Sequence, residues 1–410
     1  MKQTLKNIVT WFFAAIVIWL SFIPAVITGR YSNAAYLILG FFLAVSFFCS
    51  KKSGYFIDSE FDKFIWLFLI WNFFSALFAY DKSAAFKRYL DFVIPFITIY
   101  FMAKNELDDK RIKLLIRILF FSGIVVSIIG ILEFIYGRNM LYEGVVQNPF
   151  YKQYVSLPRI MSTMMHPTVL GTYLMICLPA SFFIIERAIG RLKKIAAMTG
   201  LAMILAALIL TFSRTGWAVS AAIAFIYFYI KNKKKMLLLT AIMVLFLSSI
   251  FIAVKLKPTV QYRVDYKHIV NYLIEGHRLE RYPLTIKMIK DHPFAGVGLN
   301  NYRILFDGYY GQNKVPYNIK IPDNMYLSIM GETGLVGMLL FVALLFCVIK
   351  KGFALLRDRE NKDWGIILVL FSSIIGILMH MVSYDLFYWI VPYYLFLLFL
   401  GGLASYSNNK

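Results

Sequence analysis

Apolar runs separated by short polar stretches make up most of this chain. Each run holds about 18 or more residues, and a helix of that length crosses a hydrocarbon core of about 30 Å. The pattern predicts an all-α polytopic membrane protein with about 12 transmembrane helices and one long, partly helical loop on the outer side. The predicted spans are residues 8–27, 34–50, 64–80, 85–103, 114–136, 166–186, 195–212, 215–230, 236–255, 326–349, 365–383 and 387–404.

One long polar interval divides these spans into two groups. The first nine spans fall in residues 1–255, the loop covers residues 256–325, and the last three spans fall in residues 326–410. We expect the two groups to form a single membrane domain and the loop to carry residues of the functional site.

The composition agrees with a membrane protein. Sixty per cent of the residues are apolar, whereas soluble domains average about 45–50%. The three cysteines, Cys49, Cys177 and Cys347, lie within apolar runs and have neither disulfide-framework nor zinc-ligand spacing. We therefore expect them to pack in the core.

The net charge of +21 would suggest a nucleic-acid partner in a soluble protein, but in a membrane protein it reflects cytoplasmic loops and an anionic substrate. The positive-inside rule places both termini in the cytoplasm. The first run follows Lys2 and Lys6, yet it is long for a signal peptide and lacks a clear cleavage site, so we expect a retained span. The loops predicted to be cytoplasmic include Lys51, Lys52, Lys104, Lys110, Arg111, Lys113, Arg187, Arg191, Lys193, Lys194, Lys350 and Lys351.

The long loop contains one helical signal. Apolar residues recur there at three- and four-residue spacing from Leu279 to Ile289. Arg278 and Arg281 lie on one side of this predicted helix, beside Tyr282, and could face lipid headgroups. In a solvated loop, such charged residues more often form only the polar face of a helix and bind no substrate. The Gly296-x-Gly298 pair lacks the strand and lysine of a nucleotide loop and predicts a tight turn.

Arg214 stands at the junction of two predicted spans, in Thr211-Phe212-Ser213-Arg214. Holding an arginine at membrane depth costs about 2.5–3.5 kcal/mol on insertion scales. A phosphate ligand explains this cost, because a guanidinium binds phosphate oxygens bidentately. The alternative is an interface anchor that extends its charge into water and headgroups.

Arg159 and His166 precede the sixth predicted span. Arg159 could contact substrate or simply flank the span. His166, directly before Pro167, could cap the helix, form a wall of the site or carry a proton.

Two acidic residues lie at and within the tenth predicted span. Asp323 precedes the span, where it could serve as the helix N-cap, as a general base on a sugar hydroxyl, or as both. Glu332 lies about two and a half turns deeper, where a carboxylate is costly unless it is paired or faces water.

The order of these motifs resembles that of the O-antigen ligase and polymerase family of bacterial envelope glycosyltransferases. The resemblance covers about residues 159–340. It rests on Arg159 with the following Pro-x-x-x-Gly, Thr-x-Ser-Arg, the Arg278 helix, His-Pro-x-x-Gly-x-Gly, Asp-Asn-x-Tyr-Leu and Glu-Thr-Gly-Leu-x-Gly.

The resemblance implies a GT-C-like enzyme of the bacterial inner membrane, with its active site facing the periplasm and with no metal or other cofactor. Its donor would be a glycan on undecaprenyl pyrophosphate, whose leaving group Arg214 and Arg278 would stabilise. The family's ligases carry a histidine as base where this chain has Asp323, which favours polymerase-type members. Tyr282 replaces a tryptophan common in the family.

The acceptor stays open between another lipid-linked repeat unit, for a polymerase, and a lipid A core or protein, for a ligase. A chain-length regulator is a candidate partner, and nucleic acid is not expected. The alternative function is a transporter or flippase of lipid-linked sugars, although the chain lacks the pseudo-repeated halves common in transporters.

Overall fold

The computed structural model of the chain describes residues 2–22, 32–50, 54–58, 60–139, 141, 159–232, 278–310 and 320–406. These residues form helices and connecting segments. The helices are α1 (Lys2–Phe22), α3 (Ser32–Ser50), α4 (Glu60–Leu77), α5 (Lys82–Pro95), η1 (Phe96–Tyr100), α6 (Phe101–Glu106), α7 (Asp109–Tyr136), α9 (Pro167–Arg187), α10 (Arg191–Leu210), α11 (Arg214–Lys231), α15 (Arg278–Asp291), α16 (Tyr302–Tyr310), α17 (Met325–Arg357), α18 (Trp364–His380), η3 (Leu386–Tyr388) and α19 (Ile390–Ser405).

The prediction of an all-helical membrane protein agrees with these elements. Among the described residues, α7, α9, α10 and α17 are long and apolar enough to cross a membrane, and shorter apolar helices lie in α1, α3, α18 and α19. The predicted span 236–255 lies outside the described residues. The count of 12 spans therefore stays a prediction.

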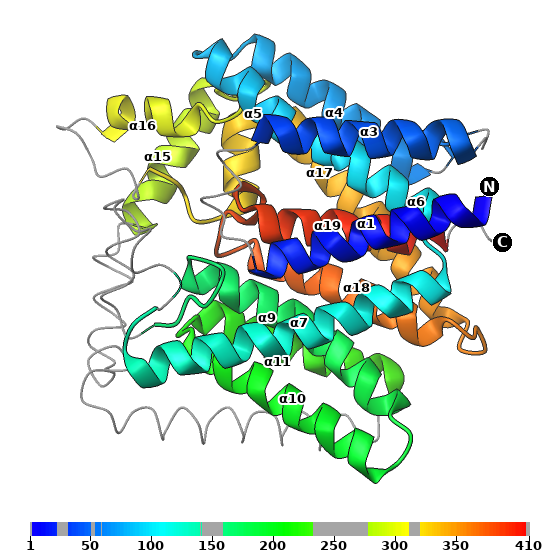
Figure 1. Cartoon of the computed structure of the whole chain (residues 1–410). Coiled ribbons are helices and arrows are strands. Elements are labelled where there is room, and N and C mark those ends of the chain that lie inside the picture. Colours follow the sequence, from blue (N-terminus) through cyan, green and yellow to red (C-terminus); the bar gives the residue numbers. More distant parts are fainter. Residues whose placement is uncertain are drawn as a thin grey trace.

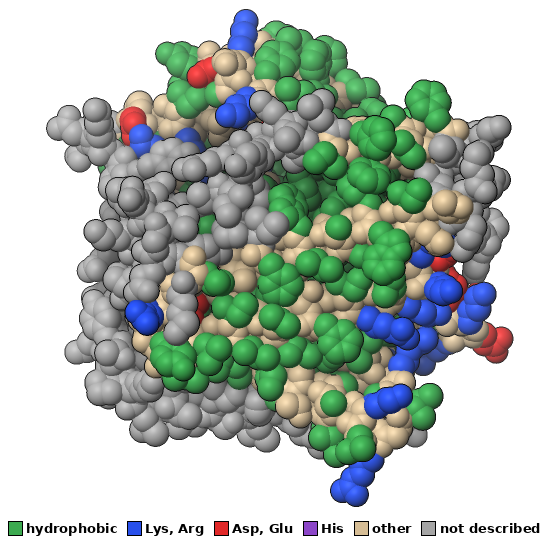
Figure 2. Space-filling model, in the orientation of Figure 1, with side chains coloured by type: hydrophobic (Ala, Val, Ile, Leu, Met, Phe, Trp, Pro, Cys, Tyr) green, Lys and Arg blue, Asp and Glu red, His purple; other side chains and the backbone are tan. Residues whose placement is uncertain are grey.

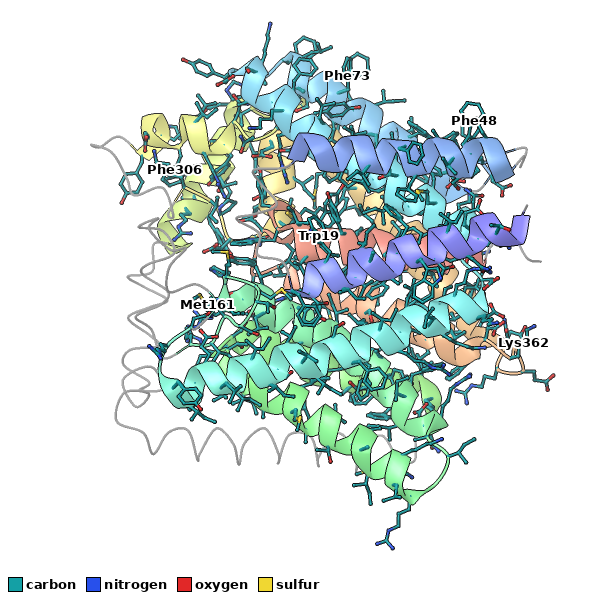
Figure 3. All side chains as sticks on the ribbon, in the orientation of Figure 1. Trp19, Phe48, Phe73, Met161, Phe306 and Lys362 are labelled. Atoms are coloured by element: carbon teal, nitrogen blue, oxygen red, sulfur yellow. The ribbon has the colours of Figure 1, made fainter. Side chains whose placement is uncertain are left out.

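The helices lie side by side, and the two termini lie together at one end of the bundle (Figure 1). Helices α15 and α16 lie at the opposite end, where Met161 and Phe306 are also found, while Lys362 lies near the termini (Figure 3). We call the end with α15 and α16 the loop end. Apolar side chains cover the visible flank of the bundle, and Lys and Arg gather at the end with the termini (Figure 2).

Helix α9 lies at the centre of the bundle. It packs against α7, α10, α11 and α18, and 83% of its apolar window is buried. Helices α7 and α10 approach closely where Gly200 of α10 faces Phe120 and Ile124 of α7. This tight packing by a small residue is common between membrane helices.

The run predicted as one span over 85–103 consists of three consecutive helical pieces, α5, η1 and α6. Pro95 ends α5, and the five residues after it form a π-helix. Proline removes one backbone donor from the helical ladder and crowds the preceding turn, so the ladder changes its spacing at this point.

Two basic residues that the sequence analysis places on the cytoplasmic side are buried within the described structure. Lys104 forms an ion pair with Asp62, with 2.6 Å between Nζ and Oδ2, and both side chains are fully inaccessible. Arg111 is also buried, and it donates to the backbone oxygen of Lys6 at 3.1 Å and to the side chains of Asn7 and Asp108. Each of these cations has polar partners that compensate for its loss of water.

Candidate active site

The described site candidates lie at the loop end of the bundle, where helices begin or end (Figure 1). They form two groups that come from different parts of the chain. One group surrounds the start of α17, and the other surrounds the starts of α9 and α11.

In the first group, Asp323 is held by Arg281 of α15. The distance from Nη1 of Arg281 to Oδ2 of Asp323 is 3.0 Å, and the same nitrogen donates to the carbonyl of Ile321 at 2.9 Å. Both side chains are largely buried, with 7% of Arg281 and 17% of Asp323 exposed. The two predicted site residues Arg281 and Asp323 thus form a charge-assisted pair that joins α15 to the entry of α17.

The helix cap at this position is Asn324, so the expectation that Asp323 caps the helix is wrong. The side chain of Asn324 accepts from the backbone N–H groups of Tyr326 and Leu327. Asp323 has a φ of +51°, a left-handed conformation that lies outside the extended backbone usual for an N-cap. Its carboxylate is directed to Arg281 instead.

Helix α17 is broken next to Glu332. Gly334 has φ 70° and ψ −174°, a conformation that is essentially restricted to glycine. The segment around Gly296 fills the break, because the N–H groups of Val297 and Gly298 donate to the carbonyls of Gly331 and Glu332 at 3.0 and 2.9 Å. Backbone groups freed by the break are thereby bonded within the protein, as membrane depth requires.

Other contacts complete this junction. Leu335 donates its N–H to the carbonyl of Pro293 at 2.8 Å, and Trp71 and Ser75 of α4 donate to carbonyls at the break. The predicted tight turn at Gly296 and Gly298 is confirmed by their φ values of 68° and 95°. This turn packs against the break in α17.

The side chain of Glu332 is buried and accepts a hydrogen bond from the hydroxyl of Tyr388 at 2.5 Å. The ring of Tyr388 lies near two guanidiniums, that of Arg88 at 4.2 Å and that of Arg303 at 5.3 Å from its centroid. Cation–π attraction and the nearby carboxylate stabilise both cations here. Sequence reasoning did not assign Arg88, Arg303 or Tyr388 to the site, although Arg88 within an apolar run was a usable signal.

Asp385 lies in the connection between α18 and α19, and sequence reasoning missed it. It is 1% exposed, and its Oδ1 accepts a hydrogen bond from the hydroxyl of Ser328 on α17. Burial, followed by the negative charge of Asp323, raises the pKa of Asp385 to about 7, against the opposing effect of Ser328. An acidic residue between two apolar runs at the loop end was the signal that could have identified it.

In the second group, Arg159 reaches the junction of α10 and α11. Its Nε donates to the carbonyl of Thr211 at 2.8 Å. Ser213 caps α11 by accepting from the N–H of Gly216, and Arg214 is the first residue of that helix, with an exposed side chain. The structure thus brings Arg159 and Arg214 to the same short junction.

His166 caps α9 through its Nδ1, which accepts from the N–H of Thr168 at 3.2 Å. Its ring packs on Tyr384 and Trp389, with centroids 5.1 and 5.0 Å apart. Burial, followed by the charge of Arg159, lowers the pKa of His166 to about 3. A neutral imidazole with such a weak tendency to take up a proton suits a capping and wall residue better than a proton carrier.

The end of α18 connects the two groups. His380 contacts Thr215, the residue after Arg214, with 3.2 Å between its Nε2 and the threonine oxygen. The next residue, Met381, accepts the N–H of Met325 at the start of α17, at 2.8 Å. The residues after Met381 then supply Tyr384 to the second group and Asp385 and Tyr388 to the first.

The remaining candidates belong to α15. Arg278 is its first residue, and the side chain of Arg278 lies outside the described residues. Tyr282, one position after Arg281, is half-buried. Within the described part of the chain, no group of three or more His, Cys, Asp or Glu side chains could hold a metal ion.

Comparison with known proteins finds a family model that matches part of the chain. Residues 199–342 match the family model described as O-Antigen ligase. A search of curated proteins found no match. The matched segment contains Arg214, Arg281, Asp323 and the break in α17, and ends before Asp385. Over this segment the chain is therefore similar to the O-antigen ligase family.

Proposed function

We propose that this protein is a multi-pass membrane glycosyltransferase that moves a glycan from undecaprenyl pyrophosphate to an acceptor hydroxyl. The observation that supports the proposal most directly is the convergence of arginines and carboxylates at the loop end of an apolar helical bundle, around the segment that matches the O-antigen ligase family. An apolar bundle suits a lipid-linked donor, and the polar loop end suits its headgroup.

The arginines of the second group would receive the leaving group. When the bond between the anomeric carbon and the pyrophosphate breaks, negative charge grows on the phosphate oxygens. Arg214 is exposed at the start of α11, where the helix dipole adds positive potential, and Arg159 lies at the same junction. With Arg278 from α15, they would stabilise the leaving pyrophosphate electrostatically.

The carboxylates of the first group would face the acceptor. The three carboxylates Asp323, Glu332 and Asp385 lie in or beside α17, and a deprotonated carboxylate near the attacking hydroxyl raises its nucleophilicity. The acceptor would be a second lipid-linked repeat unit, a lipid A core or a protein. We place the reaction at the periplasmic face of the inner membrane, with both termini in the cytoplasm.

The experiment compares surface polysaccharide in cells that carry the wild-type protein, Arg214→Ala or Arg278→Ala. Each substitution is expected to lower the rate of transfer by about 100- to 1,000-fold, the usual loss for one group that stabilises a developing anion. Membrane insertion should be unchanged, because the side chain of Arg214 is exposed and neither substitution interrupts an apolar run. Normal polymer in both variants would exclude the pyrophosphate site.

A further inference from the structure

Asp323 is poorly placed to act as the base. Its Oδ2 already accepts from Arg281 at 3.0 Å, in a pair that is largely buried. The guanidinium therefore occupies the carboxylate oxygen that an acceptor hydroxyl would need. Taking a proton at Asp323 would also leave the Arg281 guanidinium with a neutral partner in a site that excludes most water.

Asp385 has the opposite environment. Its Oδ1 is held by the hydroxyl of Ser328, whereas its Oδ2 is buried and has no hydrogen-bond partner within the part of the chain that the structure describes. A buried carboxylate oxygen that lacks a donor destabilises the folded protein. A bound ligand can remove this destabilisation by supplying the missing donor. A hydroxyl group is such a donor.

We propose that Asp385 accepts the proton of the acceptor hydroxyl and that Asp323, through its pair with Arg281, positions the carboxylates around it. This inference rests on the proposed glycosyl transfer. The hydroxyl oxygen forms a bond to the anomeric carbon, and the bond from that carbon to the pyrophosphate oxygen breaks. The electron pair leaves with the pyrophosphate, and the hydroxyl proton moves to Oδ2 of Asp385.

The surroundings of Asp385 determine when it can act. It must be deprotonated to accept the proton, so its pKa, raised to about 7 mainly by burial, sets the pH above which transfer is fast. Asp323 and Glu332 raise this pKa, while Ser328 and Arg303 lower it. The groups that face Asp385 from the packed elements are Asp323, Ser328, Glu332, Arg303 and Tyr302.

Four variants and one control variant test the assignment with purified full-length protein in liposomes that contain the lipid-linked repeat unit from its native cells. The readouts are the pH dependence of transfer and the binding of the lipid-linked repeat unit. Asp385→Asn should bind this donor with unchanged affinity, lower the rate at least 100-fold, and remove the rise of the rate near pH 7. Asp385→Glu should recover part of the rate.

The other two variants leave Asp385 in place and shift its titration in opposite directions. Asp323→Asn removes a negative neighbour, so the rise should move to lower pH. Ser328→Ala removes the hydrogen bond to the carboxylate, so the rise should move to higher pH. Asp291→Asn removes an exposed carboxylate at the end of α15 and should reproduce the wild-type profile.

The outcomes separate the two proposals. If the wild-type protein transfers no glycan, the proposed function is wrong. If the wild-type protein is active but Asp385→Asn keeps the rise near pH 7, or Asp323→Asn alone removes it, Asp385 is not the base. Should Asp385→Asn fail to fold, the shifts in Asp323→Asn and Ser328→Ala still decide, because a purely structural Asp385 would produce neither shift.

Discussion

The break in α17 gives a quantitative prediction, because two glycines share one φ value in different surroundings. Gly334 and Gly137 both have φ 70°. An added Cβ at Gly334 would lie 2.0 Å from the carbonyl oxygen of Phe294, whereas at Gly137 it would meet no described residue within 4 Å. Gly137→Ala is therefore a control for placing alanine at a positive φ without a close neighbour.

The expected losses follow from these surroundings. At Gly137, whose ψ is 12°, alanine must adopt the left-handed conformation, at about 1–2 kcal/mol. At Gly334 the conformation is essentially restricted to glycine, at about 1–3 kcal/mol, and overpacking against the Phe294 carbonyl adds about 1–3 kcal/mol. Gly334→Ala should therefore lose about 2–6 kcal/mol of unfolding free energy in total.

The assay is equilibrium unfolding of both variants in mixed detergent micelles, together with glycan transfer. Gly334→Ala should also lose transfer activity, because Glu332 lies two residues before the break and its carbonyl is bonded there by Gly298 and Ser75. If Gly334→Ala is no less stable than Gly137→Ala and transfers glycan normally, the docked break does not position the site.

Two further predictions concern buried polar pairs. Lys104→Met should destabilise the protein by about 3–5 kcal/mol, because Asp62 is left charged in the core. Adding Asp62→Leu to this variant should restore much of the lost unfolding free energy in the same assay. If nothing is restored, the ion-pair account is wrong. Tyr388→Phe should lower the unfolding free energy by about 1.5–3 kcal/mol, because it removes the hydrogen bond to Glu332. The control Tyr309→Phe removes an exposed hydrogen bond to Asp291 and should change the unfolding free energy by less than about 0.5 kcal/mol. Equal losses of unfolding free energy in the two tyrosine variants would show that the hydrogen bond to Glu332 stabilises the protein no more than an exposed one.

The helices were predictable from the sequence because lipid requires long, continuous apolar runs. For example, α9 begins at Pro167 and α11 at Arg214, each within one residue of the predicted start. The division of 85–103 at Pro95 was less visible, since proline is tolerated within membrane helices where neighbours bond the freed groups.

The composition of the site was only partly predictable. Local signals identified Arg214, Arg281 and Asp323, because charged residues at the ends of apolar runs are costly unless they have a partner or a function. The pairing of Arg281 with Asp323 depends on the tertiary fold, which brings α15 to the entry of α17. The same holds for Glu332, whose partner Tyr388 lies 56 residues further along the chain.

Asp385 shows why the rest was missed. The groups that raise or lower its pKa lie on α17, on the segment before α17 and on α16, none of which is adjacent in sequence. A single acidic residue in a short connection has no spacing pattern that predicts such an environment. Only the fold brings its neighbours together.

The central claim is that the loop end transfers a glycan from a pyrophosphate-linked lipid. The most direct test incubates purified wild-type protein in liposomes with the lipid-linked repeat unit and, in parallel, with added lipid A core. The account predicts release of undecaprenyl pyrophosphate together with a longer lipid-linked glycan or a glycosylated core. Movement of the intact lipid-linked unit across the bilayer, with no new glycosidic bond, would contradict it.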